Sequence, residues 1–250
     1  MKKFGLIGYP LGHSFSKKYF SEKFAALGLK DYSYENYPLS DISLLNRILT
    51  AEPELVGLNV TIPHKSAVIA LLDEIDDEAA KVGAVNVLKI TRIDDRIILK
   101  GYNTDVAGFR MSISPYLTSK VKRAVVLGTG GSSKAVVYTL RNMGLDVFLV
   151  SRRPSEGIMG YSGLTPEFIS GIQLIVNTTP LGMFPDTLAK PEIDYDLLTG
   201  THILYDLVYN PQLTTFLRLG RERGATIVSG ITMLHAQAEK AWEIWNSADL

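Results

Sequence analysis

The sequence predicts an α/β fold in two domains, the second of which is built on a parallel sheet. Hydrophobic runs of strand length alternate with helical segments along most of the 250 residues, which is the order that strand–helix–strand units produce. The clearest unit, 122–153, has two such runs separated by a glycine-rich turn and an amphipathic helix. Because parallel neighbours need a crossover of about this length, the unit indicates a parallel sheet.

The 122–153 unit contains each part of a parallel crossover. Residues 124–127 and 147–150 are hydrophobic at every position, as expected of strands that are buried on both faces. Residues 133–143 place apolar side chains at spacings of three and four, which predicts a helix with one buried stripe. Gly144 ends that helix, because glycine adopts the left-handed conformation at low cost.

The turn between the first strand and the helix reads Gly-Thr-Gly-Gly-Ser-Ser over 128–133. Glycines allow a sharp turn and the close approach of a pyrophosphate, and the N–H groups of the following helix then face that anion. Serine stands at 133, where the usual pattern has its third glycine. Since a strand precedes and a helix follows, the turn favours a Rossmann-like, dinucleotide-binding domain over plain turn glycines.

The second strand of the unit ends in Ser151, Arg152 and Arg153. An NAD site usually carries an acidic residue here, which holds the ribose 2′-hydroxyl. A guanidinium would instead pair with the 2′-phosphate of NADP in a charge-assisted contact. The sequence therefore predicts NADP as the cofactor. The alternative is that two exposed arginines only keep a loop solvated.

Composition excludes several other classes of protein. Basic and acidic residues number 26 each, so bulk charge indicates neither a nucleic-acid partner nor a membrane surface. The absence of cysteine excludes disulfides and thiolate metal sites, and fits a cytoplasmic protein. The four histidines lack metal-ligand spacing, so no metal is expected, and no apolar run approaches the ~20 residues of a membrane span. An early strand argues against a signal peptide, and the choice between monomer and homodimer stays open.

The chain before this unit also alternates strands and helices. Strands are predicted at 4–8, 32–37 and 55–60, and helices at 17–27, at 42–49 and from about Pro63 onward. Residues 85–92 and 96–101 flank Asp94-Asp95 and predict a hairpin at a sheet edge. Because this half lacks a phosphate-binding turn, we expect residues 1–104 to form a substrate-binding domain.

Beyond Arg153 the expected crossover helix is missing, because 154–163 contains proline and three glycines. Thr165 and Pro166 predict the start of a short helix. The remaining predicted elements are strands at 173–176, 202–207 and 225–228 and helices at 214–222 and 233–245. We expect 105–231 to form the cofactor-binding domain. The last helix, within 232–250, should pack on the first domain and complete it.

Three loops carry polar side chains that a simple connection would not need. Ser14 and Ser16 follow the first strand, although either could cap the next helix. Thr61 ends a strand, and Lys65 falls in the first turn of the helix predicted from Pro63, where the helix dipole disfavours an ammonium group. Asp105 follows the hairpin and could cap the helix after it. A residue placed against its local preference suggests a functional role.

Taken together, the motifs make the chain resemble the shikimate dehydrogenases along almost its whole length. The matching motifs are the loop 8–16, Asn-Val-Thr-Ile-Pro-His-Lys at 59–65, Gly-Ala-Val-Asn at 83–86, Asn-Thr-Asp at 103–105, the turn at 128, Asn-Thr-Thr-Pro-Leu-Gly-Met at 177–183, Tyr-Asp-Leu-Val-Tyr-Asn-Pro at 205–211 and the stretch 230–237. The resemblance implies NADP-dependent, reversible reduction of 3-dehydroshikimate to shikimate, in chorismate and aromatic amino acid biosynthesis.

The resemblance also implies a role for each matching position. Lys65 and Asp105 would be the catalytic pair. The substrate would be held by Ser14, Ser16, Thr61, Asn86, Tyr209 and Gln237. The cofactor would be lined by Gly128, Thr129, Gly130, Gly131, Ser132, Ser151, Arg152, Arg153, Thr178, Leu207 and Gly230. Both ligands are expected beyond the carboxyl ends of the strands, in the cleft between the two halves.

The chain departs from the family pattern at a few positions and leaves rival functions open. Ser132 and Ser133 stand where alanines are common, and the stretch after Arg153 is short, which bears on cofactor preference. The rivals are a quinate/shikimate dehydrogenase that uses NAD, a folate-linked dehydrogenase of similar build, and a non-catalytic NAD(P)-binding regulatory protein. The paired arginines disfavour the first, and an intact Lys65 and Asp105 disfavour the last.

Ketone reduction requires a proton donor as well as a hydride. Hydride addition leaves an alkoxide, which takes its proton from a group within hydrogen-bond reach. We predict that Lys65 is this donor and that Asp105 orients it. His13 and His64 flank the relevant loops and are the alternatives.

Overall fold

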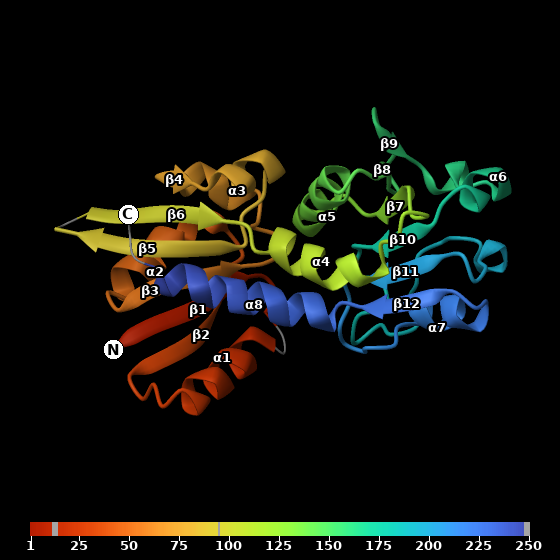
Figure 1. Cartoon of the computed structure of the whole chain (residues 1–250). Helices are drawn as coiled ribbons and strands as arrows, with labels where there is room; N and C mark the ends of the chain where they lie inside the picture. The colour runs from red at the N-terminus through yellow and green to blue at the C-terminus, as the bar shows by residue number, and fades with distance from the viewer. Residues whose placement is uncertain (12–14, 95, 248–250) are drawn as a thin grey trace. The chain divides into compact units, whose positions relative to one another are not determined.

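The computed structural model describes residues 1–11, 15–94 and 96–247 of the chain. The chain divides into two compact units, Met1–Thr104 with Ala238–Leu250 and Asp105–Gln237. Each unit contains one six-stranded sheet with helices packed on it (Figure 1). The α/β fold in two parts is therefore confirmed. Residues 232–237, which the sequence-based boundary gave to the first unit, belong to the second.

The first sheet has the strand order β2-β1-β3-β5-β6-β4. Its strands are β1 (Lys2–Gly8), β2 (Tyr32–Pro38), β3 (Leu55–Val60), β4 (Glu74–Ile75), β5 (Val87–Ile93) and β6 (Arg96–Tyr102). β1 pairs in parallel with β2 and β3, whereas β5 is antiparallel to both β3 and β6. The predicted hairpin is thus present, but the short β4 pairs with β6 and takes the sheet edge instead.

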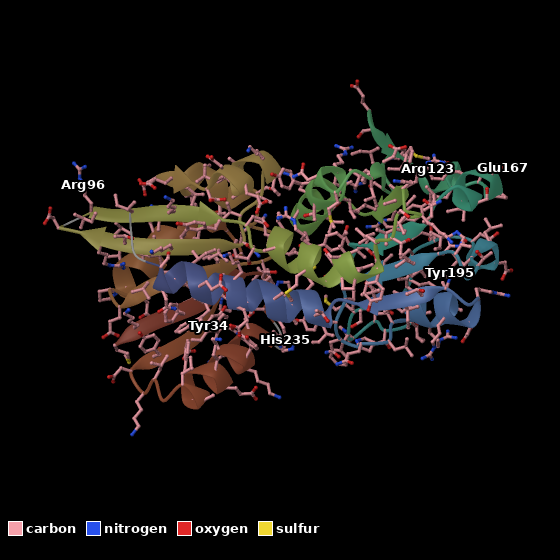
Figure 2. The ribbon with its side chains drawn as sticks, viewed as in Figure 1. Tyr34, Arg96, Arg123, Glu167, Tyr195 and His235 are labelled. Atoms are coloured by element: carbon pink, nitrogen blue, oxygen red, sulfur yellow. The ribbon has the colours of Figure 1, made fainter. Side chains whose placement is uncertain are left out.

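Separate hydrophobic clusters form on the first sheet. One holds Leu45, Leu58 and Leu88 and is covered by α2 (Leu45–Ala51), the 3₁₀ helix η2 (Ala67–Leu71) and α3 (Asp77–Val82). The other is aromatic and is covered by α1 (Phe15–Ala26) and by the later part of α8 (Ile231–Asn246). In it Tyr34, labelled in Figure 2, stacks on Phe20 with 4.8 Å between ring centres.

The last helix completes the first unit, as its amphipathic pattern predicted. Trp245 of α8 is buried in the aromatic cluster, and its indole N–H donates to the carbonyl oxygen of Leu88 at 3.0 Å. Ala238 and Ala241 face the same cluster and are fully buried. The later half of α8 therefore belongs to the core of the first unit.

The helix predicted from Pro63 is absent. Residues 61–66 form turns, and only the five-residue η2 follows, beginning at Ala67. The Lys65 carbonyl oxygen accepts the Val85 N–H at 2.7 Å, so it is committed to a distant strand rather than to a helix ladder. Lys65 consequently precedes a short 3₁₀ helix, and the helix-dipole argument made for it from the sequence does not apply.

The second sheet is parallel throughout, with the order β12-β11-β10-β7-β8-β9. Its strands are β7 (Arg123–Leu127), β8 (Asp146–Val150), β9 (Ile158–Met159), β10 (Leu174–Asn177), β11 (Ile203–Asp206) and β12 (Thr226–Ser229). From β7 the chain proceeds outward through β8 and β9, then returns to the other side of β7 and continues through β10 to β12. The order reverses between β7 and β10, and ligands of such sheets bind beyond the carboxyl ends of strands at this switch point.

Helices cover both faces of the second sheet. α4 (Asp105–Ile113), α5 (Gly131–Asn142) and the start of α8 pack around Val126. α6 (Pro166–Ser170) and α7 (Thr215–Glu222) pack around Val125 on the opposite face. The predicted cap of α6 is confirmed, since the Thr165 hydroxyl accepts the Phe168 N–H at 3.3 Å. Among the described residues, no helix is long and apolar enough to cross a membrane.

Candidate active site

The glycine-rich turn leaves β7 at the switch point of the second sheet. Gly128 has a φ of 108°, a conformation that favours glycine, and an added Cβ would lie 2.8 Å from the Thr178 hydroxyl oxygen. Gly130 is the N-cap of α5, and an added Cβ there would meet nothing within 4 Å. At Gly128 the turn therefore packs tightly against the neighbouring protein. At Gly130 there is free space, beside the N–H groups that begin a helix.

Side chains on both sides of this turn brace its backbone. The Ser133 hydroxyl donates to the Gly128 carbonyl oxygen at 2.6 Å. From the neighbouring strand, the N–H and hydroxyl of Thr178 both donate to the Leu127 carbonyl oxygen, at 2.9 and 2.7 Å. The structure thus brings together Thr178 and Gly128, both of which were predicted to line the cofactor, and the Thr178 hydroxyl is bound to the main chain that leads into the turn.

Asp105 and Ser132 also meet near the turn. Asp105 is the first residue of α4 and is 5% exposed, while Ser132 is half-buried in the first turn of α5. The Ser132 hydroxyl donates to Asp105 Oδ2 at 3.3 Å. A residue predicted to act on the substrate and one predicted to line the cofactor are therefore hydrogen-bonded to each other.

Leu207 and Gly230 lie together on the other side of the switch point. An added Cβ at Gly230 would be 2.4 Å from the Leu207 carbonyl oxygen, so only glycine permits this approach. The Leu207 N–H donates to the Asn177 carbonyl oxygen at 3.0 Å. Two residues further on, Tyr209 is half-buried, and this burial raises the pKa of its phenol.

The arginines after β8 are exposed. The Ser151 N–H donates to the Met159 carbonyl oxygen at 2.9 Å, and the Ser151 hydroxyl accepts the Arg153 N–H at 3.2 Å. Ser151 thus shapes the bend from which Arg152 and Arg153 extend into solvent. Their exposure leaves both guanidinium groups accessible to an anionic ligand.

A buried carboxylate that sequence reasoning missed ends β11. Asp206 accepts hydrogen bonds from the Asn177 side-chain amide at 2.9 Å, the Val208 N–H at 3.0 Å and the Thr214 hydroxyl at 2.6 Å. Asn177, Asp206 and Thr214 are all fully buried. Burial raises the pKa of Asp206 to about 7, while these donors act in the opposite direction.

This network fixes the loops that carry predicted site residues. Asn177 and Asp206 are register partners at the carboxyl ends of adjacent strands, and Thr178 and Leu207 follow directly. The Thr214 hydroxyl also accepts the Leu217 N–H at 3.3 Å and so caps α7. A polar residue that ends each of two neighbouring hydrophobic runs was the signal in the sequence that could have revealed the pair.

In the first unit, polar groups at the ends of β3 and β5 form a neutral network. The Asn86 side-chain amide donates to the Thr104 hydroxyl at 3.0 Å and accepts the Thr104 N–H at 2.7 Å. The Asn59 amide accepts the Tyr34 hydroxyl at 2.7 Å. All four side chains are buried. Asn86 therefore fixes Thr104, the residue that directly precedes Asp105, in addition to the substrate role implied by resemblance.

Ser16 extends this network instead of capping a helix. α1 begins at Phe15, so Ser16 is its second residue and not the N-cap that the alternative explanation required. Ser16 hydrogen-bonds to the Tyr34 hydroxyl, whose pKa burial raises. Ser14 and His13 lie outside the described residues.

Thr61 and Lys65 follow β3 and are both half-buried. The Thr61 N–H donates to the Ile7 carbonyl oxygen at 2.9 Å, which fixes Thr61 beside the end of β1. His64 is buried, and its Nε2 lies 2.5 Å from the Leu39 carbonyl oxygen. His64 thus has a structural contact in the core, which makes it a weaker alternative to Lys65 as a proton donor.

Gln237 is half-buried in α8, close to α4. An added Cβ on Gly108 of α4 would lie 3.1 Å from the Gln237 backbone nitrogen, so a glycine lets the two helices approach. The Gln237 amide donates to the Leu234 carbonyl oxygen at 3.0 Å.

The second unit fits a dinucleotide by its own geometry. A pyrophosphate requires main-chain N–H groups and a turn without obstructing side chains, and both occur at Gly128–Ser132. The exposed arginines at the end of β8 match a 2′-phosphate. The residues present therefore fit NADP.

Comparison with known proteins agrees with these features. The profile of the shikimate dehydrogenase substrate binding domain matches residues 6–88. The shikimate dehydrogenase (NADP(+)) of Methanosphaera stadtmanae is 35% identical over 96% of this chain and 90% of its own length.

Solved structures extend the likeness to the fold. Shikimate 5-dehydrogenase from Thermus thermophilus in complex with NADP(H) and shikimate has a TM-score of 0.84 at 31% identity, over 98% of this chain and 94% of that one. Quinate dehydrogenase from Corynebacterium glutamicum in complex with NAD has a TM-score of 0.83 at 28% identity, over 98% and 93%. With identity above 30% over nearly the full length of curated relatives, the chain belongs to the shikimate dehydrogenase family.

Proposed function

We propose that this protein is an NADP-dependent shikimate dehydrogenase that reversibly reduces 3-dehydroshikimate to shikimate in chorismate biosynthesis. The observation that carries the proposal is the open glycine turn at the switch point of a parallel sheet, followed at the end of β8 by two exposed arginines. Relatives of nearly the same length carry the same activity and cofactor in their names, which supports it.

The cofactor part of the proposal assigns one function to each segment of the second unit. Main-chain N–H groups of Gly128–Ser132 hold the pyrophosphate, and Ser151, Arg152 and Arg153 hold the 2′-phosphate. Thr178, Leu207 and Gly230 line the remainder. When bound, NADPH supplies the hydride for ketone reduction.

The substrate part rests on hydrogen bonds, because a small polyol acid offers little apolar surface. Such sites discriminate strongly against analogues that lack a hydroxyl. We assign substrate binding to Ser14, Ser16, Thr61, Asn86, Tyr209 and Gln237. Four of these residues are half-buried, which supports the assignment, because such a side chain is partly accessible to a ligand and partly shielded from water: Ser16, Thr61, Tyr209 and Gln237.

Proton transfer is assigned to Lys65 and Asp105. A ketone that accepts a hydride must gain a proton on its oxygen, and an ammonium group can donate one directly. Lys65 is half-buried, which excludes part of the competing water, and Asp105 is a nearly buried carboxylate that can fix an ammonium group by a charge-assisted bond. In the reverse direction Lys65 would accept the proton of the shikimate hydroxyl.

The domain roles follow from these assignments. We propose that the first unit, residues 1–104 with the later half of the last helix, binds the substrate and that the second unit, residues 105–237, binds NADP. The family profile for a substrate binding domain, which covers 6–88, supports the first of these roles. The proposal includes a cytoplasmic location, as expected of an NADP-linked biosynthetic enzyme, and gel filtration would distinguish monomer from homodimer.

The second candidate function is an NAD-dependent quinate dehydrogenase. The likeness to a quinate dehydrogenase in complex with NAD favours it, because the TM-score is nearly that of the shikimate enzyme. Arg152 and Arg153 argue against it, since an NAD site gains nothing from two guanidinium groups. A non-catalytic regulatory role is disfavoured by the retention of Lys65 and Asp105.

One assay separates these candidates. Purified protein is given shikimate or quinate with NADP+ or NAD+, and nicotinamide reduction is followed by absorbance. We expect the highest kcat/KM for shikimate with NADP+. A preference for quinate with NAD+ would favour the second candidate. No reduction with any pair, together with measurable NADP+ binding, would support a non-catalytic protein.

A further inference from the structure

A side-chain hydrogen bond joins the N-terminal ends of α4 and α5. The two helices pack against each other in the second unit (Figure 1). Asp105 begins α4, and Ser132 is the second residue of α5. The Ser132 hydroxyl donates to Asp105 Oδ2 at 3.3 Å, and the aspartate is 5% exposed. A neutral donor on the cofactor turn therefore contacts the carboxylate to which we assigned a part in proton transfer.

A hydroxyl next to Ser132 holds the backbone of the turn. That role falls to the adjacent Ser133, whose hydroxyl donates to the Gly128 carbonyl oxygen at 2.6 Å. The two neighbouring hydroxyls thus contact different partners, one a main-chain carbonyl and the other a carboxylate. Alanine at 132 would keep the backbone bonds of the turn and suits a helix at least as well as serine.

We propose that Ser132 is a positioning residue for the reaction, which holds the Asp105 carboxylate in its working orientation from the turn that binds the cofactor. This inference rests on the proposed function, in which Asp105 is catalytic. A carboxylate rotates about its terminal torsion within a broad energy well, so a fixed donor on one oxygen restricts where the other oxygen points. At 3.3 Å the hydroxyl is farther from Oδ2 than in a strong O–H···O⁻ bond, so we assign it an effect on the direction of the carboxylate rather than a large binding energy.

The same geometry predicts what Ser132 does not do. A hydroxyl has one proton to donate, and that of Ser132 is given to Asp105. The pyrophosphate then depends on main-chain N–H groups of the turn. Removal of the Ser132 hydroxyl should therefore lower turnover while it leaves NADP+ affinity nearly unchanged.

The test compares two alanine variants of adjacent serines. Ser132→Ala should lower kcat for shikimate oxidation on the order of tenfold, the loss of one hydrogen bond to a charged group. Its Kd for NADP+, measured by calorimetry without shikimate, should stay within about twofold of wild type, as expected if the bond serves the acid rather than the cofactor. Ser133→Ala should instead weaken NADP+ binding, because it loosens the turn. Ser132→Thr keeps the hydroxyl and should restore most of the lost rate.

A double-mutant cycle identifies the partner through which Ser132 acts. In an Asp105→Ala background, the further change Ser132→Ala should alter kcat by less than about twofold, because the acceptor is gone. The inference is overturned if Ser132→Ala has the same effect in both backgrounds, or if it raises the Kd for NADP+ as much as it lowers kcat/KM.

The outcomes also separate this inference from the proposed function. A wild-type protein without shikimate-dependent NADP+ reduction would overturn both. Full activity in Asp105→Ala would overturn the catalytic role of Asp105 and the inference with it. An active wild type, an impaired Asp105→Ala and a normal Ser132→Ala would overturn only the inference.

Discussion

The two sheets end in buried polar networks that differ in charge. In the first unit, Asn59, Asn86 and Thr104 contribute only amides and hydroxyls. In the second, Asn177 and Thr214 donate to Asp206, a carboxylate. Hydrogen bonds between neutral groups do not change over the ordinary pH range, whereas a buried carboxyl gains or loses a proton. Of these two networks, only that of the second unit should therefore respond to pH.

The physical cause of this difference is desolvation. Burial disfavours the charged form of Asp206 and raises its pKa to about 7, whereas its neutral donors recover only part of the lost hydration. Burial, and to a lesser extent the charge of Asp206, raises the pKa of the Tyr195 and Tyr205 phenols. Loops that carry Thr178 and Leu207 begin at this network, so its protonation bears on the cofactor side of the site.

The largest expected effect is a loss of turnover caused by a change in the first unit, with no effect on cofactor binding in the second. Lys65→Ala in the first unit should lower kcat by ~10²–10⁴-fold, about 3–5 kcal/mol of barrier, because general acid–base catalysis is typically worth this much. The Kd for NADP+ should not change. Steady-state kinetics under conditions where chemistry limits turnover, together with calorimetry, would measure both.

Retention of more than about a tenth of wild-type kcat would contradict the role of Lys65, since general acid–base groups contribute at least ~10²-fold. His13 would then be the next candidate, because His64 is occupied by a core contact.

The next largest effect tests the charge difference directly. The folded-state pKa of Asp206 lies above that of an unfolded aspartate. Between about pH 4 and 7, the folded protein therefore keeps a proton that the unfolded chain has already released. The contribution of this group to the free energy of unfolding is therefore greatest at low pH and is lost as pH rises to about 7.

Asp206→Asn should remove that dependence. The free energy of unfolding of the variant minus that of wild type should become more favourable to the variant by about 2–4 kcal/mol as the pH rises from 4 to 8. This is the equivalent of a shift of a few pKa units. Denaturant unfolding at several pH values would measure the difference. Parallel pH curves for the two proteins would show that Asp206 titrates normally.

A smaller effect is expected at the end of β8. Arg152→Ala should weaken NADP+ binding by ~1.5–3 kcal/mol, or roughly ten- to a hundredfold, through loss of a charge-assisted contact. NAD+ affinity should hardly change, and neither should the KM for shikimate, because the first unit is untouched. Equal losses for both cofactors would indicate a structural role for the arginine.

The smallest effect should be confined to the core of the first unit. Trp245→Phe removes the indole N–H from the Leu88 carbonyl oxygen and should cost about 1–2 kcal/mol of stability, because a buried acceptor loses its partner. Thermal unfolding would report the loss, while NADP+ affinity serves as the control. A change in NADP+ affinity as large as the change in stability would show that the two units are energetically coupled.

The elements that could be predicted from the sequence are those specified by local pattern. Except for the two-residue β4 and β9, which were not predicted, the strands of both sheets follow from hydrophobic runs, and the cap of α6 by Thr165 follows from capping preferences. The six-residue α3 was missed although Asp76 caps it by accepting the Glu78 N–H, because so short a helix has little periodicity. The predicted helix after Pro63 was wrong, since a long-range bond from Val85 to the Lys65 carbonyl competes with it.

For the site, too, features set by local sequence could be predicted, and features set by long-range contacts could not. The glycine turn at 128–133 follows from spacing and fold class, whereas Thr178 was named only through the family resemblance. The Asn177–Asp206 network and the bond from Ser132 to Asp105 depend on which strands and helices become neighbours, which no short motif encodes. The sequence thus indicated which segments hold the predicted site residues, and only the structure revealed which of their side chains are hydrogen-bonded to one another.

The two-segment composition of the first unit has a consequence for the order of biosynthetic folding. Its aromatic core needs Ala241 and Trp245, which are synthesised after the whole of the second unit. On the ribosome, the second unit is one continuous segment and can fold as soon as it emerges. The first unit, although translated earlier, stays incomplete, with Phe4 and Phe20 lacking their cover until α8 emerges. The part of the chain made first is therefore the part that finishes folding last.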